Sequence, residues 1–198
     1  MPDPEPPVES WQREKANTRH ALQVLASQMD EHTRGQDLFV AYTYAKKVAA
    51  RALQARMFMH LPERNEDFHR IHARVQAELD ARYGNFFPDG FLKTPYSGQL
   101  HERLFSLLQE NLNTDLEGDM LRIVTADSVH TERRARELRE LGLDVECRKA
   151  KEGDFYNLHS LDLTFERLPS LVRTITRSKV KEKSERDRLL ERAGIQSA

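Results

Sequence analysis

The chain has 198 residues, of which 38% are hydrophobic and 32% charged, and its formal net charge is −1. This length suits one large domain or two small ones, and the composition suits a globular protein with a modest core and a highly charged surface. A net charge so close to zero excludes a general attraction for nucleic acid, and a single cysteine, Cys147, excludes a disulfide framework and a cysteine-rich zinc site.

The first ten residues, MPDPEPPVES, are acidic and rich in proline. Prolines among polar residues cannot build a core, so we expect residues 1–8 to form a disordered tail. The segment lacks the basic start and the apolar middle of a signal peptide, and no run of about 18 apolar residues follows it. We therefore expect a cytoplasmic protein with no membrane partner.

Three helices are predicted between residues 9 and 84, and we expect them to form a helical bundle. Helical spacing of apolar residues indicates helices at 9–29, at 35–60 and from Glu63 to Gly84. The second helix carries a face of small residues that permits close packing, either inside the bundle or between two copies of the chain in a homodimer. This face consists of Ala41, Ala45, Val48, Ala49 and Ala52.

Residues 85–97 interrupt the helical pattern with two prolines and four aromatic residues. They are predicted to be a linker loop that marks a domain boundary. Residues 98–160 then have the element order of a winged helix-turn-helix. It begins with a helix at 98–112, a short strand at 121–124, and a short helix that contains Val129 and is capped by Asp127 or Ser128.

A strongly basic helix is predicted at 131–142, capped by Thr131 and closed by Gly142. Apolar and polar residues alternate from 143 to 148, which indicates a strand and places Cys147 in the core. The segment 151–154 supplies a hairpin turn, and a return strand begins at Phe155. This hairpin would be the wing of the winged helix.

On a helical wheel, Ala135, Leu138 and Leu141 share one side of the basic helix, whereas Arg133 and Arg136 point the opposite way. In a DNA major groove these two arginines would read base edges, since an arginine can give guanine two hydrogen bonds worth about 1–3 kcal/mol of discrimination. Further residues would hold the DNA backbone without reading sequence. They are Thr131, Arg139, Arg148, Lys149 and Lys151.

Two other interpretations of the basic helix stay open. Its glutamates and arginines recur at spacings of three and four, which is also typical of an ordinary solvated helix. A winged helix can also bind a protein in place of DNA.

The pattern VTADSVHTERRARELRELGLDVECRK…DFYNL resembles the winged-helix module found in or beside bacterial HNH-type restriction endonucleases. The resemblance runs from Gln99 to Leu158 and rests on a cap, an arginine pair, a REL-R-x-x-G run and a strand that ends in Tyr-x-Leu. These are Thr131, Arg133–Arg134, Arg136–Gly142 and Tyr156–Leu158. It implies recognition of double-stranded DNA in a restriction or defence setting, with a nuclease as a partner. The chain contains no Cys-x-x-Cys pair and no His-Asn-His set, so the resemblance does not imply cleavage.

Residues 161–198 are predicted to form a basic helical tail. Between positions 167 and 193 there are nine basic residues against four acidic ones. Such a segment could lie along DNA phosphates, or it could be a solvated helix with Lys/Glu pairs.

Chemistry-bearing motifs are scarce. His69 and His72 lie three residues apart and could share a metal ion, but no third ligand follows at a conventional spacing. No nucleophile motif, phosphate-binding loop or dinucleotide fingerprint occurs. We therefore predict no catalytic residues, no metal site and no cofactor.

The sequence thus predicts a mainly α protein with an N-terminal helical bundle, a winged helix-turn-helix with a small β-hairpin wing, and a basic helical C-terminal tail. The predicted function is binding of double-stranded DNA, as the recognition component of a restriction or defence system or as a transcriptional regulator. The alternative is a protein–protein adaptor whose winged helix docks an effector nuclease.

Overall fold

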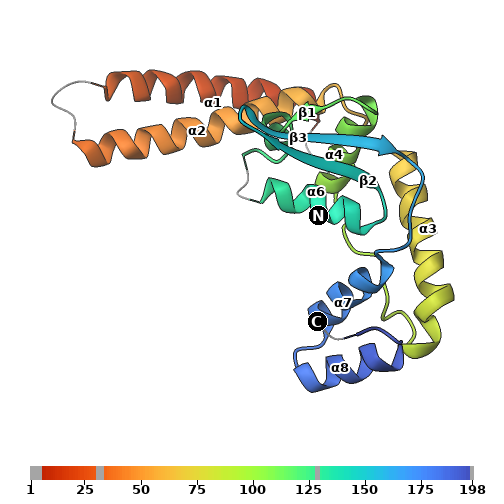
Figure 1. The fold of residues 1–198 in the computed structure, drawn as a ribbon. Helices are drawn as coiled ribbons and strands as arrows, with labels where there is room; N and C mark the ends of the chain where they lie inside the picture. Colours follow the sequence, from red (N-terminus) through yellow and green to blue (C-terminus); the bar gives the residue numbers. More distant parts are fainter. Residues whose placement is uncertain (1–5, 30–33, 128–129, 197–198) are drawn as a thin grey trace. The chain divides into compact units, whose positions relative to one another are not determined.

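The computed structural model describes residues 6–29, 34–127 and 130–196 (Figure 1). Within these ranges the fold is mainly helical with a small three-stranded sheet, as predicted. The chain divides into two compact units, one made of residues 1–63 and 117–131 and the other of residues 64–116 and 132–198. This division does not follow the linker expected at 85–97.

The first unit is built on a hairpin of two long helices, α1 (Pro7–Ser27) and α2 (Gly35–Phe58), which lie side by side (Figure 1). Helix α1 begins at Pro7, so the tail expected at 1–8 is too long by two residues, and residues 1–5 lie outside the described ranges. Proline suits a first helical position because its missing N–H would have no partner there.

The small-residue face of α2 is covered within the chain. Ala45 and Val48 form a core with Ala21 of α1, and Leu25 packs against it. Ala41 and Ala52 are also buried. This face therefore packs two helices of the same chain together, and it is not free to form the homodimer seam considered above.

A third helix of the first unit, α5 (Gly118–Val124), occupies the segment predicted as a strand, so the strand prediction at 121–124 was wrong. Leu121 and Val124, three residues apart, are fully buried, and that spacing suits one face of a helix. Short apolar runs do not distinguish the two states by periodicity alone. The amide of Gln54 donates to the carbonyl of Val124 at 2.6 Å and joins α2 to α5. The short helix expected around Val129 falls on residues 128–129, outside the described ranges.

The second unit contains α3 (Glu66–Tyr83), the short 3-10 helix η1 (Gly84–Phe86) and α4 (Gln99–Glu110). Helix α3 begins after Asn65, whose side chain accepts a hydrogen bond from the backbone N–H of Phe68 at 3.1 Å. The predicted start at Glu63 is therefore too early. The predicted apolar stripe of α3 is confirmed, because Phe68, Ile71, Val75 and Leu79 are all buried.

Helix α3 belongs with α4 and not with the α1–α2 hairpin, so residues 9–84 do not form one bundle. The amide of Asn65 donates to Ser106 at 2.9 Å and to Gln109 at 2.7 Å. The rings of Phe68 and Phe105 lie 5.5 Å apart. A cap residue and a core aromatic thus tie α3 to α4.

The sheet consists of β1 (Leu116–Glu117), β2 (Asp144–Ala150) and β3 (Gly153–Ser160) in the order β1-β3-β2. Strands β2 and β3 form the predicted hairpin, in which Ala150 pairs with Gly153. Val145 and Tyr156 are buried, whereas Cys147 is only half-buried and is not the core residue that its alternating position suggested. The element order is α4, β1, α5, α6 (Thr131–Glu140), β2, β3. The two residues of β1 thus come before α5, earlier in the chain than the strand expected at 121–124.

The C-terminal segment forms α7 (Leu168–Lys179) and α8 (Lys183–Arg192). Helix α7 buries Leu171, Val172 and Ile175 almost completely, and Leu190 of α8 is also buried. The basic helices predicted here are present, but apolar packing makes them part of the second unit's core and not a fully solvated tail.

Candidate nucleic-acid interface

The basic helix α6 (Thr131–Glu140) has the two sides that its sequence predicts. Ala135, Leu138 and Leu141 are no more than 1% exposed, so burial of this apolar side fixes the helix in its unit. Arg133 and Arg136 are exposed. The outward direction of the two arginines assigned to base reading is therefore what the wheel predicts.

Gly142 ends α6 and is required there for two reasons. Its φ of +95° lies in the left-handed region, and a Cβ atom would approach the carbonyl oxygen of Thr164 to 2.3 Å. The N–H of Thr164 also donates to the carbonyl of Gly142 at 3.0 Å. This close approach fixes the path of the chain from the end of α6 to the start of β2.

Arg133 is anchored at its base by a buried carboxylate. Its Nε donates to Oε1 of Glu137 at 2.9 Å, while 63% of its side chain stays exposed. Because the bond uses Nε, the two terminal amino groups of the guanidinium remain for another partner. A side chain held in this way is ordered before it meets a ligand.

Glu137 is 4% exposed and accepts two further hydrogen bonds on its other oxygen. They come from Nε2 of His101 at 2.7 Å and from Nη1 of Arg134 at 2.9 Å. Burial alone would raise the pKa of Glu137, but the hydrogen bonds from His101, Arg134 and Arg133 outweigh burial and lower it. Glu137 is therefore a carboxylate at neutral pH.

Burial lowers the pKa of His101, against the opposing effect of Glu137. His101 is thus neutral at pH 7, and its contact with Glu137 is a hydrogen bond from a neutral ring and not an ion pair. Its Nε2 must carry the proton, since a carboxylate can only accept. The ring of Tyr96 lies 5.5 Å from that of His101, and its hydroxyl donates to Glu140 at 2.6 Å.

This polar cluster of Tyr96, His101, Glu137 and Glu140 was not anticipated from the sequence. A signal could have come only from the spacing of Glu137, three and four residues from Arg134 and Arg133, which exposed helices also show.

Arg136 is exposed, and no ion pair with another residue in the described ranges involves it. Arg139 differs from the prediction. It is half-buried, and its Nε is shielded from solvent without a hydrogen-bond partner among the described residues. Arg139 is thus less available to a phosphate than Arg136.

The hairpin carries the remaining predicted cations. Lys149 and Lys151 are exposed at its outer end. Arg148 donates to Asp115 at 2.6 Å and lies over the ring of Phe155, with 4.9 Å between its Cζ and the ring centroid. The Arg148 guanidinium and then the Asn157 amide lower the pKa of Asp115, so this pair is fully charged at neutral pH.

Thr131 was expected to contact a phosphate, but its side chain is hydrogen-bonded to another residue of the first unit. It is 3% exposed, and its hydroxyl lies 2.6 Å from the hydroxyl of Thr125. A buried hydroxyl in such a bond contributes to the start of α6 and offers little to an external ligand.

His69 and His72 both lie near the ring of Phe68, but their further contacts differ. Nε2 of His69 lies 3.1 Å from a carboxylate oxygen of Glu102. The ring of His72 packs on Phe68 with 4.6 Å between centroids, and burial lowers its pKa to about 4. No cluster of three or more potential metal-binding residues occurs in the part of the chain that the structure describes.

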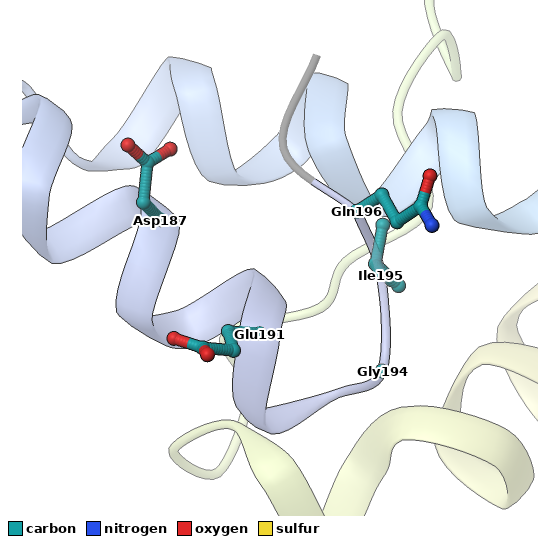
Figure 2. A pocket seen from close by; sticks show the side chains of 5 residues that line it. All are labelled: Asp187, Glu191, Gly194, Ile195 and Gln196. Atoms are coloured by element: carbon teal, nitrogen blue, oxygen red, sulfur yellow. The ribbon is translucent and has the colours of Figure 1, made fainter.

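The C-terminal basic residues are only partly available. Lys179 donates to the carbonyl of Phe91 and lies over its ring, and Arg173 donates to the carbonyl of Gln196 at 2.9 Å. A hollow of about 520 Å³ lies beside α8. It is lined by Asp187 and Glu191 and by residues 194–196, whose side chains are drawn in Figure 2. The two carboxylates lie one turn apart and would repel a phosphate in this hollow.

No helix of residues 6–29, 34–127 or 130–196 combines the length and apolarity that a membrane crossing requires. Comparison of the chain with family models, curated proteins and solved structures finds no match.

Proposed function

We propose that the chain binds double-stranded DNA through helix α6 and the β2–β3 hairpin, which apart from Thr131 belong to the second unit. The observation that carries the proposal is the pair Arg133 and Arg136. They lie three residues apart on the exposed side of a helix whose opposite side is buried. A helix with this composition suits a major groove, where arginine is the commonest reader of guanine.

The buried Glu137 supports base reading by Arg133. It binds Nε and leaves the terminal amino groups, which are the donors that can meet O6 and N7 of guanine together. A guanidinium that is already oriented loses less conformational entropy on binding than a free one. Arg136, which lacks such an anchor among the described residues, would adapt to the neighbouring base pair.

The hairpin would add affinity without sequence preference. Lys149 and Lys151 are exposed cations that can approach phosphates, and each phosphate contact makes the binding constant fall with salt. Arg148 contributes less, because binding phosphate would require it to leave Asp115. In this proposal the chain is the recognition component of a restriction or defence system or a transcriptional regulator.

The test begins with selection of bound duplexes from a random pool, followed by anisotropy titrations with the selected duplex and a scrambled one. We expect Arg133→Ala combined with Arg136→Ala to abolish the difference between the two duplexes. We expect Lys149→Ala combined with Lys151→Ala to weaken both equally and to reduce the salt slope by about 2.

Lys47→Ala combined with Arg51→Ala is the matched control. It removes two exposed positive charges from α2, which belongs to the first unit. If this control reduces binding as much as the α6 variant, the assignment of the site to α6 is wrong. Absence of duplex binding by the wild-type chain at low salt contradicts the function itself.

A specific observation favours the adaptor as the second candidate. Arg133, Arg134 and Arg148 all form ion pairs with carboxylates of the chain, which reduces the positive potential of the surface. Mixed charge of this kind is typical of the rim of a protein–protein interface. An adaptor would show no affinity for duplex DNA at low salt, and its α6 variants would lose binding to a nuclease partner.

A further inference from the structure

The end of the α1–α2 hairpin formed by residues 21–29 and 35–45 has an unusual composition. No charged residue occurs from Ala21 to Met29 or from Leu38 to Ala45, and Asp37 is the one charged residue of the two segments, in a chain of which 32% is charged. Large apolar side chains are nevertheless exposed on it. Their exposed fractions are 51% for Leu22, 74% for Met29, 65% for Phe39 and 53% for Tyr42.

These side chains border a groove between the two helices. The groove has a volume of about 430 Å³ and is lined almost entirely by apolar atoms. Its lining residues are Leu25, Met29, Gly35, Leu38, Phe39 and Tyr42. We call this surface, together with Leu22, the hairpin groove.

The hairpin cannot cover this surface with its own residues. The core between its helices consists of the small side chains Ala21, Ala45 and Val48, with Leu25 packed against them. A pair of helices must bury its apolar stripe against another layer to be stable. Within the first unit, α5 is bonded to α2 at Gln54, in the half of the helix that follows the groove residues.

We propose that the hairpin groove binds the same groove of a second copy of this chain and forms a four-helix interface with it. Two helical hairpins packed side by side give a common bundle arrangement. In a two-fold contact the same surface patch of each copy meets that of the other, so a groove lined by uncharged residues brings no like charges together.

The exposed area also fits a dimer. From the exposed fractions, with roughly 150–250 Å² for each large side chain, the groove offers on the order of 500 Å² of apolar surface per copy. A stable homodimer buries about 800 Å² per partner, of which about 65% is apolar. The two values agree, and the polar residues beside the groove would supply the rest of the interface.

This inference does not depend on DNA binding. The hairpin groove, and not the small-residue face of α2, is the proposed dimer surface, because Ala41, Ala45 and Val48 of that face are buried. A dimer would present two copies of α6, and a two-fold DNA site would then follow if both proposals hold.

The test is sedimentation equilibrium of the full chain across a range of concentrations. We expect the wild-type chain, of 23.1 kDa, to associate to twice that mass. Phe39→Glu and Met29→Glu, tested separately, should each weaken the dimer at least about thirtyfold, because each places a charge in a desolvated contact. Both side chains are exposed in a single chain, so circular dichroism should show unchanged helix content.

Val8→Glu is the matched control, since Val8 lies in α1 beyond the groove and is 53% exposed. It should leave the association constant unchanged. A wild-type chain that remains monomeric at roughly 100 μM overturns the proposal, because an interface of this area should hold well below that concentration. A dimer that survives both groove variants overturns it as well. Binding of the monomeric chain to neutral phosphatidylcholine vesicles, lost in Phe39→Glu, would assign the groove to lipid instead.

Discussion

Replacement of Glu137 by alanine tests whether the buried carboxylate organises the candidate interface. The substitution leaves the Nε2–H of His101, whose side chain is 8% exposed, without its acceptor. An unsatisfied buried donor costs about 1–3 kcal/mol. The side chains of Arg133 and Arg134 are 63% and 34% exposed and can return to water, so each lost ion pair costs at most about 1 kcal/mol. We therefore expect a loss of about 2–4 kcal/mol, or roughly 10 °C in Tm.

Urea and thermal unfolding followed by far-ultraviolet circular dichroism measure this loss. Tryptophan fluorescence is the wrong probe, because the single tryptophan, Trp11, lies in the first unit. Glu132→Ala is the control, since Glu132 is exposed on the same helix and should change stability by less than about 0.5 kcal/mol. If Glu137→Ala is as stable as this control, the carboxylate does not hold the three donors and the reasoning fails.

The pH dependence gives a second measure of the same group. The folded state lowers the pKa of Glu137 below its ordinary value of 4.5. Its contribution to stability is therefore complete above that value and is lost as the pH falls through the folded-state pKa. The difference in stability between the wild type and Glu137→Gln should be constant near neutral pH and should shrink below about pH 4.5. A difference that is independent of pH down to pH 3 would show that the carboxylate charge has no part in it.

Other residues carry separate predictions. Burial lowers the pKa of His72 from 6.5 to about 4, so the folded state disfavours its charged form and loses stability as the pH falls from 6.5 to 4. Because part of the ring reaches solvent, we expect this loss to be about 2 kcal/mol and to be reduced in His72→Gln, as urea unfolding at pH 7 and pH 4.5 would measure. If the wild type and His72→Gln lose the same stability between pH 7 and pH 4.5, the loss does not come from protonation of His72. Gly142→Ala should destabilise the chain by roughly 2–4 kcal/mol, because its Cβ would lie 2.3 Å from the Thr164 carbonyl oxygen in a left-handed conformation. Gly84→Ala, at a helical φ with open space, should be neutral or slightly stabilising. The reverse order of the two variants in thermal unfolding would refute the backbone argument.

The elements that the sequence predicted well are those with local periodicity. The stripe of α3 and the two sides of α6 follow from the 3.6-residue repeat, and the β2–β3 hairpin follows from alternation around a glycine turn. The error at α5 has the same origin. Seven residues are too few for a period to distinguish a helix from a strand, and the outcome depended on which apolar residues found a partner surface.

For the polar residues of the candidate site, the sequence predicted some positions and not others. That Arg133 and Arg136 point outward was predictable, because the direction of a helical side chain is fixed by its register relative to the apolar side. That Arg139 is half-buried and that the hydroxyl of Thr131 contacts that of Thr125 was not predictable, since neither follows from the helical register of α6.

By itself, the sequence determined the mainly helical class, the order of helix and hairpin around α6, and the outward position of its central arginines, since these depend on neighbours within about a turn. Only the tertiary structure decided that α3 pairs with α4, that Glu137 is buried beneath Arg133, and that the end of the α1–α2 hairpin is left uncovered. The physical reason is the range of the interactions. His101 is 36 residues from Glu137 and Asn65 is 41 from Ser106, and no local pattern encodes which distant donor will reach a given acceptor once the apolar surfaces have packed.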